Sequence, residues 1–363
     1  MSFNWQKPEW PNFHYSLEAV GTDLVEYAHK SGKISGLLSG LPTDEQVEAA
    51  LQAMVVEAIK TSEIEGEYLS KEDVMSSVRN QLGLNDPIEQ VRDRASEGAS
   101  ELMIAVRNSW EEPLSEETLF AWHRALMKGT PRVERGAWRS HEDPMQVISN
   151  PYGKPRIHFE APPSKQVPRE MTQFIDWYNE SRIEIAHPPI RAAIAHLYFE
   201  SIHPFEDGNG RIGRAISEKA LSQGANRPIL ISLSAAIEAK KSDYYQALEK
   251  TQRSNEISDW IAYFVSIILI AQNQTEERIE FVLKKKRFFE THQSTLSERQ
   301  LRVVNRMLAE GPSGFEGGMS ARKYKALTGV SKATATRDLQ DLASSGVLTP
   351  IGGGRSVRYE LAL

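Results

Sequence analysis

The sequence predicts a mainly α-helical protein that contains a short β-hairpin and ends in a winged helix-turn-helix domain. Apolar residues recur at three- and four-residue steps over most of the chain, which is typical of amphipathic helices. Residues 136–163 interrupt this spacing, because the segments MQVIS and RIHFE flank NPYGKP as two short strands flank a turn. From residue 296 on, the order helix, helix, turn, helix, strand, glycine turn, strand predicts the winged helix.

The individual helices follow from the apolar spacing and from the prolines in the loops between them. In chain order we expect helices over residues 45–64, 86–109, 115–127, 168–181, 190–201, 209–223, 241–253 and 257–287. The C-terminal helices are expected over residues 296–311 and 319–330, and a third starts at Ser331 and ends at Gly346. The strands of the wing are expected in the last segment, IGGGRSVRYELAL.

Length, cysteine content and the pattern of apolar residues limit the classes of protein to which the chain can belong. The 363 residues leave room for two or three domains of roughly 100–200 residues each. The absence of cysteine excludes disulfides, zinc–thiolate sites and a cysteine nucleophile. The N-terminus lacks a signal-peptide pattern, and the longest apolar run, residues 260–271, is shorter than the roughly 20 residues that span a bilayer. We therefore expect a cytoplasmic protein without a membrane partner.

Charge is distributed unevenly along the chain. Residues 296–363 contain ten Lys or Arg and six Asp or Glu, a net charge of about +4, whereas the whole chain carries −6. This asymmetry supports a separate C-terminal domain. We predict an N-terminal helical cap in residues 1–110, a catalytic core in residues 111–290 and the winged helix in residues 296–363.

The segment FESIHPFEDGNGRIGRAI concentrates groups suited to phosphate chemistry. His203 follows an apolar helix and can accept a proton from a hydroxyl group. Asp207 is an oxygen ligand of the kind that Mg²⁺ takes together with phosphates. The glycines of residues 208–210 let backbone N–H groups converge at the start of the next helix. Arg211 and Arg214, three residues apart, can both bind the same anion, so we predict a phosphate-transfer site without a covalent protein intermediate.

The segment also allows two other interpretations. A DGNG tetrapeptide by itself is most often only a turn. Glu200 and His203 have Glu-x-x-His spacing, with His196 about two turns earlier, which is a pattern of carboxylate-bridged metal centres. That centre needs a second Glu-x-x-His on another helix, which the sequence lacks. The phosphate interpretation accounts for the whole set of polar residues, and the metal interpretation for only one of them.

The segment HPFEDGNGRIGR, residues 203–214, resembles the signature H-x-F-x-[DE]-G-N-G-R-x-x-R of the Fic family at every specified position. The resemblance implies a helical core that transfers AMP from ATP to a protein hydroxyl. It implies that His203 is the general base and that Asp207 holds Mg²⁺. It also implies that Phe205 is a buried anchor and that the hairpin at residues 145–159 is a flap that aligns the target's backbone as an added strand.

The resemblance further implies a nucleotide-binding set and the roles of its members. Residues 208–211 would wrap the α- and β-phosphates, and Arg214 would contact the γ-phosphate. The tyrosines of KKSDYYQALEKTQ would border the adenine and ribose, with Gln252 nearby, although aromatic residues on helices more often belong to a core. The implied nucleotide-binding residues are His203, Gly208, Asn209, Gly210, Arg211, Ile212, Gly213, Arg214, Tyr244 and Tyr245.

A second motif lies near the N-terminus, in KTSEIEGEYL. Thr61, Glu65 and Gly66 resemble the inhibitory helix motif [ST]-x-x-x-E-[GN] of the same family. A carboxylate at residue 65 would pair with the guanidinium of Arg214 and so take the place of the γ-phosphate. The alternative is that the glutamates of this stretch form a solvated helix end capped by the glycine.

These observations predict a Mg²⁺-dependent, autoinhibited protein adenylyltransferase that uses ATP. Its partners would be target proteins with a Ser, Thr or Tyr hydroxyl, and the protein itself. One alternative is a nucleotide-sensing transcription regulator that binds DNA through residues 296–363. The residues expected to contact DNA are Ser331, Lys332, Thr334 and Arg337 of the third helix and Arg355 and Arg358 of the wing. The winged helix could instead mediate protein contacts or a homodimer. Another alternative is the removal of AMP, with the carboxylate of Glu65 orienting a water molecule.

Overall fold

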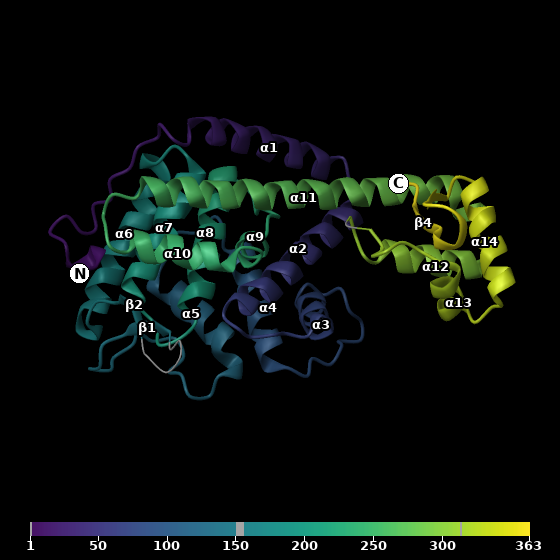
Figure 1. Ribbon diagram of the computed structural model, residues 1–363. Coiled ribbons are helices and arrows are strands. Elements are labelled where there is room, and N and C mark those ends of the chain that lie inside the picture. Colours follow the sequence, from purple (N-terminus) through teal and green to yellow (C-terminus); the bar gives the residue numbers. More distant parts are fainter. Residues whose placement is uncertain (1, 150–155, 313) are drawn as a thin grey trace. The chain divides into compact units, whose positions relative to one another are not determined.

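The computed structural model describes residues 2–149, 156–312 and 314–363 (Figure 1). The chain forms two compact units. The larger comprises Met1–Gly36 and Pro42–Asn273, and the smaller comprises Leu37–Leu41 and Gln274–Leu363. None of the helices in the described part of the chain has the length and apolar content needed to cross a membrane.

The larger unit is mainly helical, as the sequence predicts. Its helices, labelled in Figure 1, are α1 (Gly21–Ser39), α2 (Thr43–Ile64), α3 (Lys71–Gln81), α4 (Arg94–Asn108), α5 (Glu116–Leu126), α6 (Val167–Glu184), α7 (Pro188–Ile202), α8 (Asn209–Ala225), α9 (Leu233–Glu238), α10 (Lys241–Thr251) and the first part of α11 (Ser258–His292). The helix α8 packs against α7, and also contacts α2, α4, α5, α6 and α9.

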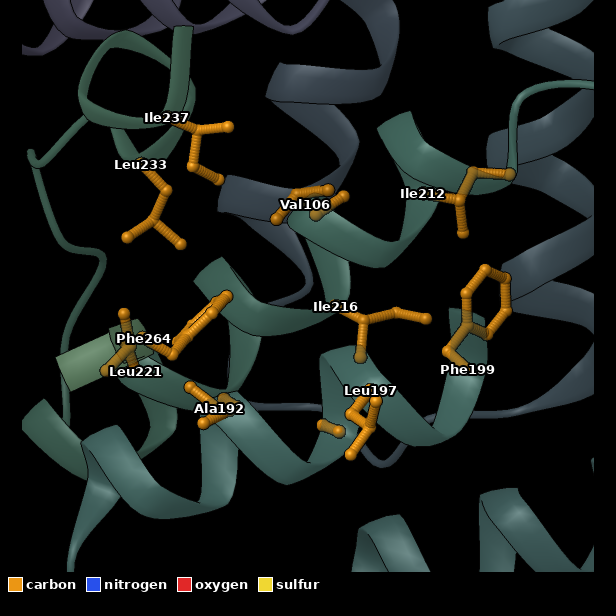
Figure 2. Packing of buried hydrophobic residues seen from close by; sticks show 14 of the residues in the cluster. Val106, Ala192, Leu197, Phe199, Ile212, Ile216, Leu221, Leu233, Ile237 and Phe264 are labelled. Atoms are coloured by element: carbon orange, nitrogen blue, oxygen red, sulfur yellow. The ribbon is translucent and has the colours of Figure 1, made fainter. Parts of the chain in front are cut away.

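The centre of the larger unit is an apolar core around α7 and α8. Every residue from Pro189 to Ile202 is buried, so α7 is covered on all sides, in keeping with its mainly apolar sequence. Figure 2 shows part of this core, formed by Val106, Ala192, Leu197, Phe199, Ile212, Ile216, Leu221, Leu233, Ile237 and Phe264. Because close-packed cores resist displacement, the loop that joins α7 to α8 has rigid supports at both ends.

A short hairpin interrupts the helices, as predicted. Strands β1 (Gln146–Ser149) and β2 (Arg156–Glu160) pair antiparallel, with Val147 opposite Phe159. Phe159 is buried, whereas Ile148 and Ile157 are exposed. The hairpin is therefore attached to the core at one end of β2. Its predicted turn, NPYGKP, lies outside the described residues.

The smaller unit has the element order expected of a winged helix. It contains α12 (Glu298–Leu308), α13 (Ala321–Thr328), α14 (Lys332–Ser344), β3 (Leu348–Ile351) and β4 (Arg358–Leu361). The two strands pair antiparallel. A separate apolar core, which includes Val303, Met307, Tyr324, Leu339 and Tyr359, holds these elements together.

The structure corrects several boundaries. The helix expected over residues 86–109 begins only at Arg94, because the side chain of Asp93 accepts hydrogen bonds from the N–H groups of Ala95 and Ser96 and so caps α4. The first wing strand, β3, starts before the glycine-rich segment, two residues after Gly346, whose φ of +76° follows the end of α14. The helices α1, α3 and α9 were not predicted.

Candidate active site

His203 sits at the point where α7 ends. Its backbone adopts the left-handed conformation, with φ of 51°, and its N–H still donates to the carbonyl of Phe199 at 2.9 Å. This conformation is uncommon for a residue with a side chain, and it turns the chain sharply out of the helix. Arg139 holds the turn, because its Nε donates to the carbonyl of His203 at 2.8 Å. The His203 side chain remains 16% exposed, so the imidazole is accessible from outside the core.

The loop after His203 is anchored by Phe205 and Asn209. Phe205 is fully buried, as predicted. The Asn209 side chain accepts from the N–H of Phe205 at 2.9 Å and donates to its carbonyl at 2.8 Å, which closes the loop on itself. These two bonds fix the segment that carries Asp207.

A buried histidine that the sequence did not single out supports the same loop. The ring of His123 on α5 stacks on Phe205, with centroids 4.0 Å apart. Its Nδ1 accepts from the N–H of Gly136 at 2.9 Å, so Nε2 carries the proton and donates to the carbonyl of Asp207 at 3.2 Å. Burial lowers the pKa of His123 to about 4, so this ring is neutral at physiological pH.

The start of α8 has the features of an anion cradle, which consists of the helix N-terminus together with Arg211 and Arg214. Gly208, with φ of 81°, turns the chain into the helix, whose N-terminus carries the positive end of the dipole. Arg211 and Arg214 are 3% and 1% exposed, so both guanidinium groups are removed from water. Nε of Arg211 and Nη1 of Arg214 are buried without a hydrogen-bond partner among the described residues. Buried donors that lack partners are rare, and a polyphosphate would satisfy both.

The end of α2 places Glu65 on Arg214. Nη2 of Arg214 donates to Oε1 of Glu65 at 2.8 Å and to the carbonyl of Thr61 at 2.9 Å, while Nε donates to Oγ1 of Thr61 at 2.8 Å. Burial opposes the positive charge of Arg214, but the neighbouring acidic groups, Glu65 first among them, together outweigh it and raise the pKa of the guanidinium. The alternative of a solvated helix end therefore does not hold for Glu65.

A second carboxylate, that of Glu67, pairs with Arg211. In the sequence this residue stands out only as part of an acidic stretch. Oε2 of Glu67 is 2.5 Å from Nη1 of Arg211. Gly66, with φ of 84°, separates the two glutamates and lets both reach α8. The sequence signal for this contact was the repeat of glutamate two residues apart around a glycine. Arg214 and Arg211 are thus each paired with one carboxylate from the segment that follows α2, that of Glu65 and that of Glu67 respectively.

The donor set around Asp207 fits a magnesium ion that is shared with phosphates. The side chain is 48% exposed, and Oδ1 accepts from the N–H of Gly208 at 2.6 Å and lies 3.4 Å from Nη2 of Arg211. Within residues 2–149, 156–312 and 314–363, no group of three or more His, Asp or Glu side chains could hold a metal ion. An ion at Asp207 would therefore take its other ligands from a substrate and from water. The alternative metal centre around Glu200 gains no support.

The two predicted tyrosines differ in position. Tyr245 is 38% exposed, and its hydroxyl donates to the carbonyl of Ile64 at 3.4 Å, next to Glu65. Tyr244 is buried in the core, and its hydroxyl lies 2.8 Å from Nε2 of His196. Tyr245 thus borders the anion cradle, whereas Tyr244 has the surroundings of a core residue.

Ile212 and Gly213, also expected to bind nucleotide, face inward. Ile212 is fully buried. A Cβ atom at Gly213 would lie 2.6 Å from Oε1 of Glu200 and 3.2 Å from the ring of His196. The side of α8 that carries these two residues therefore packs on α7 and not on an open pocket.

Comparison with known proteins supports the resemblance seen in the sequence. Residues 113–221 match the Fic/DOC family, so the chain contains a Fic/DOC domain. Residues 3–84 match a domain of unknown function (DUF4172), and residues 317–362 match the C-terminal domain of DIP2311-like transcriptional regulators.

Two curated relatives are named as adenylyltransferases. The protein adenylyltransferase Fic of Nematostella vectensis is 28% identical over 144 residues, which are 40% of this chain and 30% of the relative. A probable protein adenylyltransferase of Aquifex aeolicus is 32% identical over 164 residues, which are 41% of this chain and 47% of the relative. The aligned region is less than half of either relative.

Solved structures share the fold. A Fic family protein from Desulfovibrio desulfuricans aligns with 97% of this chain and 98% of its own length, with a TM-score of 0.55 and 19% identity. A Fic domain containing signaling protein from Bacteroides thetaiotaomicron aligns with 71% of this chain and 97% of its own length, with a TM-score of 0.53 and 20% identity. These likenesses confirm the mainly helical, Fic-type fold.

Proposed function

We propose that this protein transfers AMP from ATP to a Ser, Thr or Tyr hydroxyl of a target protein or of itself. The observation that carries the proposal is the accessible imidazole of His203 just before the start of α8, where two buried arginines have unsatisfied donors. The Fic/DOC domain and the relatives named protein adenylyltransferases support it.

The proposed reaction is an in-line displacement at the α-phosphorus. Nε2 of His203 accepts the proton of the attacking hydroxyl, whose oxygen bonds to the α-phosphorus. The bond from that phosphorus to the oxygen that bridges to the β-phosphate breaks, and pyrophosphate leaves. Arg211, Arg214 and the N-terminus of α8 stabilise the negative charge of the phosphates during the displacement. Tyr245 would border the adenosine.

Magnesium has one proposed ligand from the protein. Asp207 would hold Mg²⁺, which when bound neutralises part of the phosphate charge. The hydrogen bond from the Gly208 N–H to Asp207 and the support of His123 keep this carboxylate in place. An incoming ATP would therefore bring most of the ion's coordination with it.

The hairpin β1–β2 is the proposed docking site for the target chain. A two-stranded sheet leaves edge N–H and C=O groups that an extended peptide can pair with. The exposed side chains of Ile148 and Ile157 add an apolar surface beside that edge. Such backbone pairing would present a target hydroxyl with little dependence on sequence.

We propose that the conformation seen in this structure is the autoinhibited one. Glu65 and Glu67 neutralise the two guanidinium groups that should contact phosphate. A triphosphate must displace both carboxylates, or bind with its γ-phosphate away from Arg214. Because a carboxylate and a phosphate at the same guanidinium repel each other, removal of Glu65 should free the productive position.

The proposal is tested by incubating the purified protein with ATP labelled at the α-phosphate and Mg²⁺. We expect weak self-labelling in the wild type, an increase in Glu65→Gly, and no labelling when His203→Ala is added to Glu65→Gly. Glu63→Gln is the matched control, because Glu63 pairs with Lys60 at 2.6 Å and not with an arginine of the cradle. Absence of label in folded Glu65→Gly, with and without candidate target proteins from a cell extract, would contradict the proposal.

The smaller unit supports a second proposed activity, the binding of DNA. It matches a domain of transcriptional regulators, and Lys332 and Arg337 are exposed on α14. The acidic Asp338 of the same helix is turned inward, where it accepts from Arg299 at 2.7 Å and from the Tyr324 hydroxyl at 2.9 Å. Asp338 therefore adds no negative charge beside Lys332 and Arg337, which suit contact with a phosphate backbone, whereas Asp341 of the same helix is exposed.

This second proposal is tested with the full chain and a pool of duplex DNA fragments at several salt concentrations. If two phosphate contacts are lost, the double variant Lys332→Ala/Arg337→Ala should bind more weakly and reduce the salt slope by about 2. Binding that is absent at low salt, or unchanged in the double variant, would indicate that α14 does not contact DNA.

A further inference from the structure

The helix α7 carries a line of three titratable side chains that ends at His203. His196 and Glu200 are four residues apart and lie on one face of α7, and His203 is the residue that caps this helix. Glu200 is 4% exposed, and its Oε2 lies 3.6 Å from Nδ1 of His203. Its other oxygen, Oε1, is buried without a hydrogen-bond partner among the described residues. The carboxylate therefore has His203 as its nearest polar partner.

The charge of Glu200 is maintained despite its burial. Burial acts to raise the pKa of this carboxyl, but the neighbouring His203, His196 and Arg214 outweigh it and hold the pKa below its usual range. Burial lowers the pKa of His196, whose Nε2 is paired with the Tyr244 hydroxyl. Glu200 is thus the permanently charged member of the line at neutral pH.

The backbone of α8 is shaped to accept this carboxylate. A Cβ atom at Gly213 would come within 2.6 Å of Oε1 of Glu200, which is closer than non-bonded atoms approach. Glycine at this position therefore makes room for the buried acid. This requirement explains why residue 213, which faces inward and away from the anion cradle, is a glycine.

We propose that Glu200 is a positioning residue for His203, a role that rests on the proposed AMP transfer. The carboxylate attracts the N–H group at Nδ1 of the imidazole and keeps the ring in the Nδ1–H tautomer, which leaves the lone pair on Nε2 to receive the proton of the attacking hydroxyl. When Nε2 takes that proton, the imidazolium is stabilised by the adjacent negative charge, and the Nδ1 proton stays on the ring. The acid orients the base and does not itself become protonated.

The kinetic test uses Glu65→Gly as the parent, so that inhibition by Glu65 does not hide an effect on the rate of AMP transfer. Adding Glu200→Gln removes the charge and keeps the shape, and kcat should fall about 10- to 100-fold with little change in the KM for ATP. Glu200→Asp, which keeps the charge, should retain more of the activity than Glu200→Gln. Glu170→Gln is the matched control, because Glu170 is an equally buried carboxylate that bonds Trp10 and Arg169 away from the site.

The direct test is the tautomer of His203, read from ¹⁵N chemical shifts of the full chain and assigned by difference from His203→Asn. We expect the Nδ1–H tautomer in the parent and its loss in Glu200→Gln. A dominant Nε2–H tautomer in the parent, or a Glu200→Gln variant with the parent's kcat, would overturn the inference. If Glu200→Gln fails to fold, the parent's tautomer still decides. A parent without activity would instead contradict the proposed AMP transfer, and the tautomer would still report on Glu200.

Discussion

Glu65 accepts a hydrogen bond from Nη2 of Arg214 at 2.8 Å, across 149 residues of sequence. Thr61, one turn earlier on α2, supplies two further acceptors to the same guanidinium through its hydroxyl and its carbonyl. The contact is therefore made by a helix end and not by one flexible side chain. Because Arg214 is almost fully buried, a phosphate that binds its Nη2 or Nε has to replace these acceptors.

Removing acceptors from Arg214 should release the proposed activity in steps. Glu65→Gly removes the competing charge, and we expect the initial rate of self-labelling to rise at least about 10-fold, because hydrogen bonds to charged groups contribute roughly 1.5–3 kcal/mol. Thr61→Val removes only the hydroxyl acceptor and should raise the rate by less. Ser62→Ala is the control, because the Ser62 hydroxyl is buried next to Thr61 without a partner among the described residues. A larger effect of Ser62→Ala than of Thr61→Val would contradict this assignment.

Glu67 should act mainly on nucleotide affinity. Its carboxylate competes with phosphate for Arg211, so Glu67→Gln in the Glu65→Gly background should bind Mg²⁺–ATP about 3- to 10-fold more tightly. The effect should shrink at high ionic strength, because the Glu67 side chain is 38% exposed and the pair is partly screened. Titration calorimetry at two salt concentrations measures both quantities. Unchanged or weaker binding in Glu67→Gln, with Glu63→Gln as reference, would show that Glu67 orients Arg211 and does not compete for it.

The sequence predicted the parts of the site that depend on local order along the chain. The segment 203–214 needs only a helix end, a glycine turn and a helix start, and all three are encoded locally. The contact between Glu65 and Arg214 was expected only through the resemblance of its motif. The partners of Glu67 and His123 depend on how α2 and α5 pack on α8, which local spacing does not encode. The helix α1 was not predicted, because only three of its residues are buried and its apolar pattern is therefore weak.

The buried ring of His123 predicts that acid destabilises the larger unit. Its pKa is about 4 in the folded protein and about 6.5 in an unfolded chain, so the unfolded state binds more protons between these values. The free energy of unfolding should fall as the pH drops from 6.5 towards 4, by up to about 3 kcal/mol from this group. Urea unfolding at pH 7 and pH 5 measures the loss, and His123→Gln should reduce it. An equal pH dependence in His123→Gln would assign the loss to other groups, such as His196.

The close approach of Gly213 and Glu200 predicts a coupling between two positions on different helices. In the Glu65→Gly background, Gly213→Ala adds a Cβ atom that displaces the carboxylate, so kcat should fall although no group of the phosphate cradle has changed. Glu200→Ala removes the obstacle together with the positioning charge, and the added methyl group should then cost little more. A double-mutant cycle of kcat, with circular dichroism to check folding, isolates this interaction. If the two effects are simply additive, Gly213→Ala disturbs the site by another route, such as a shift of α8 against α7.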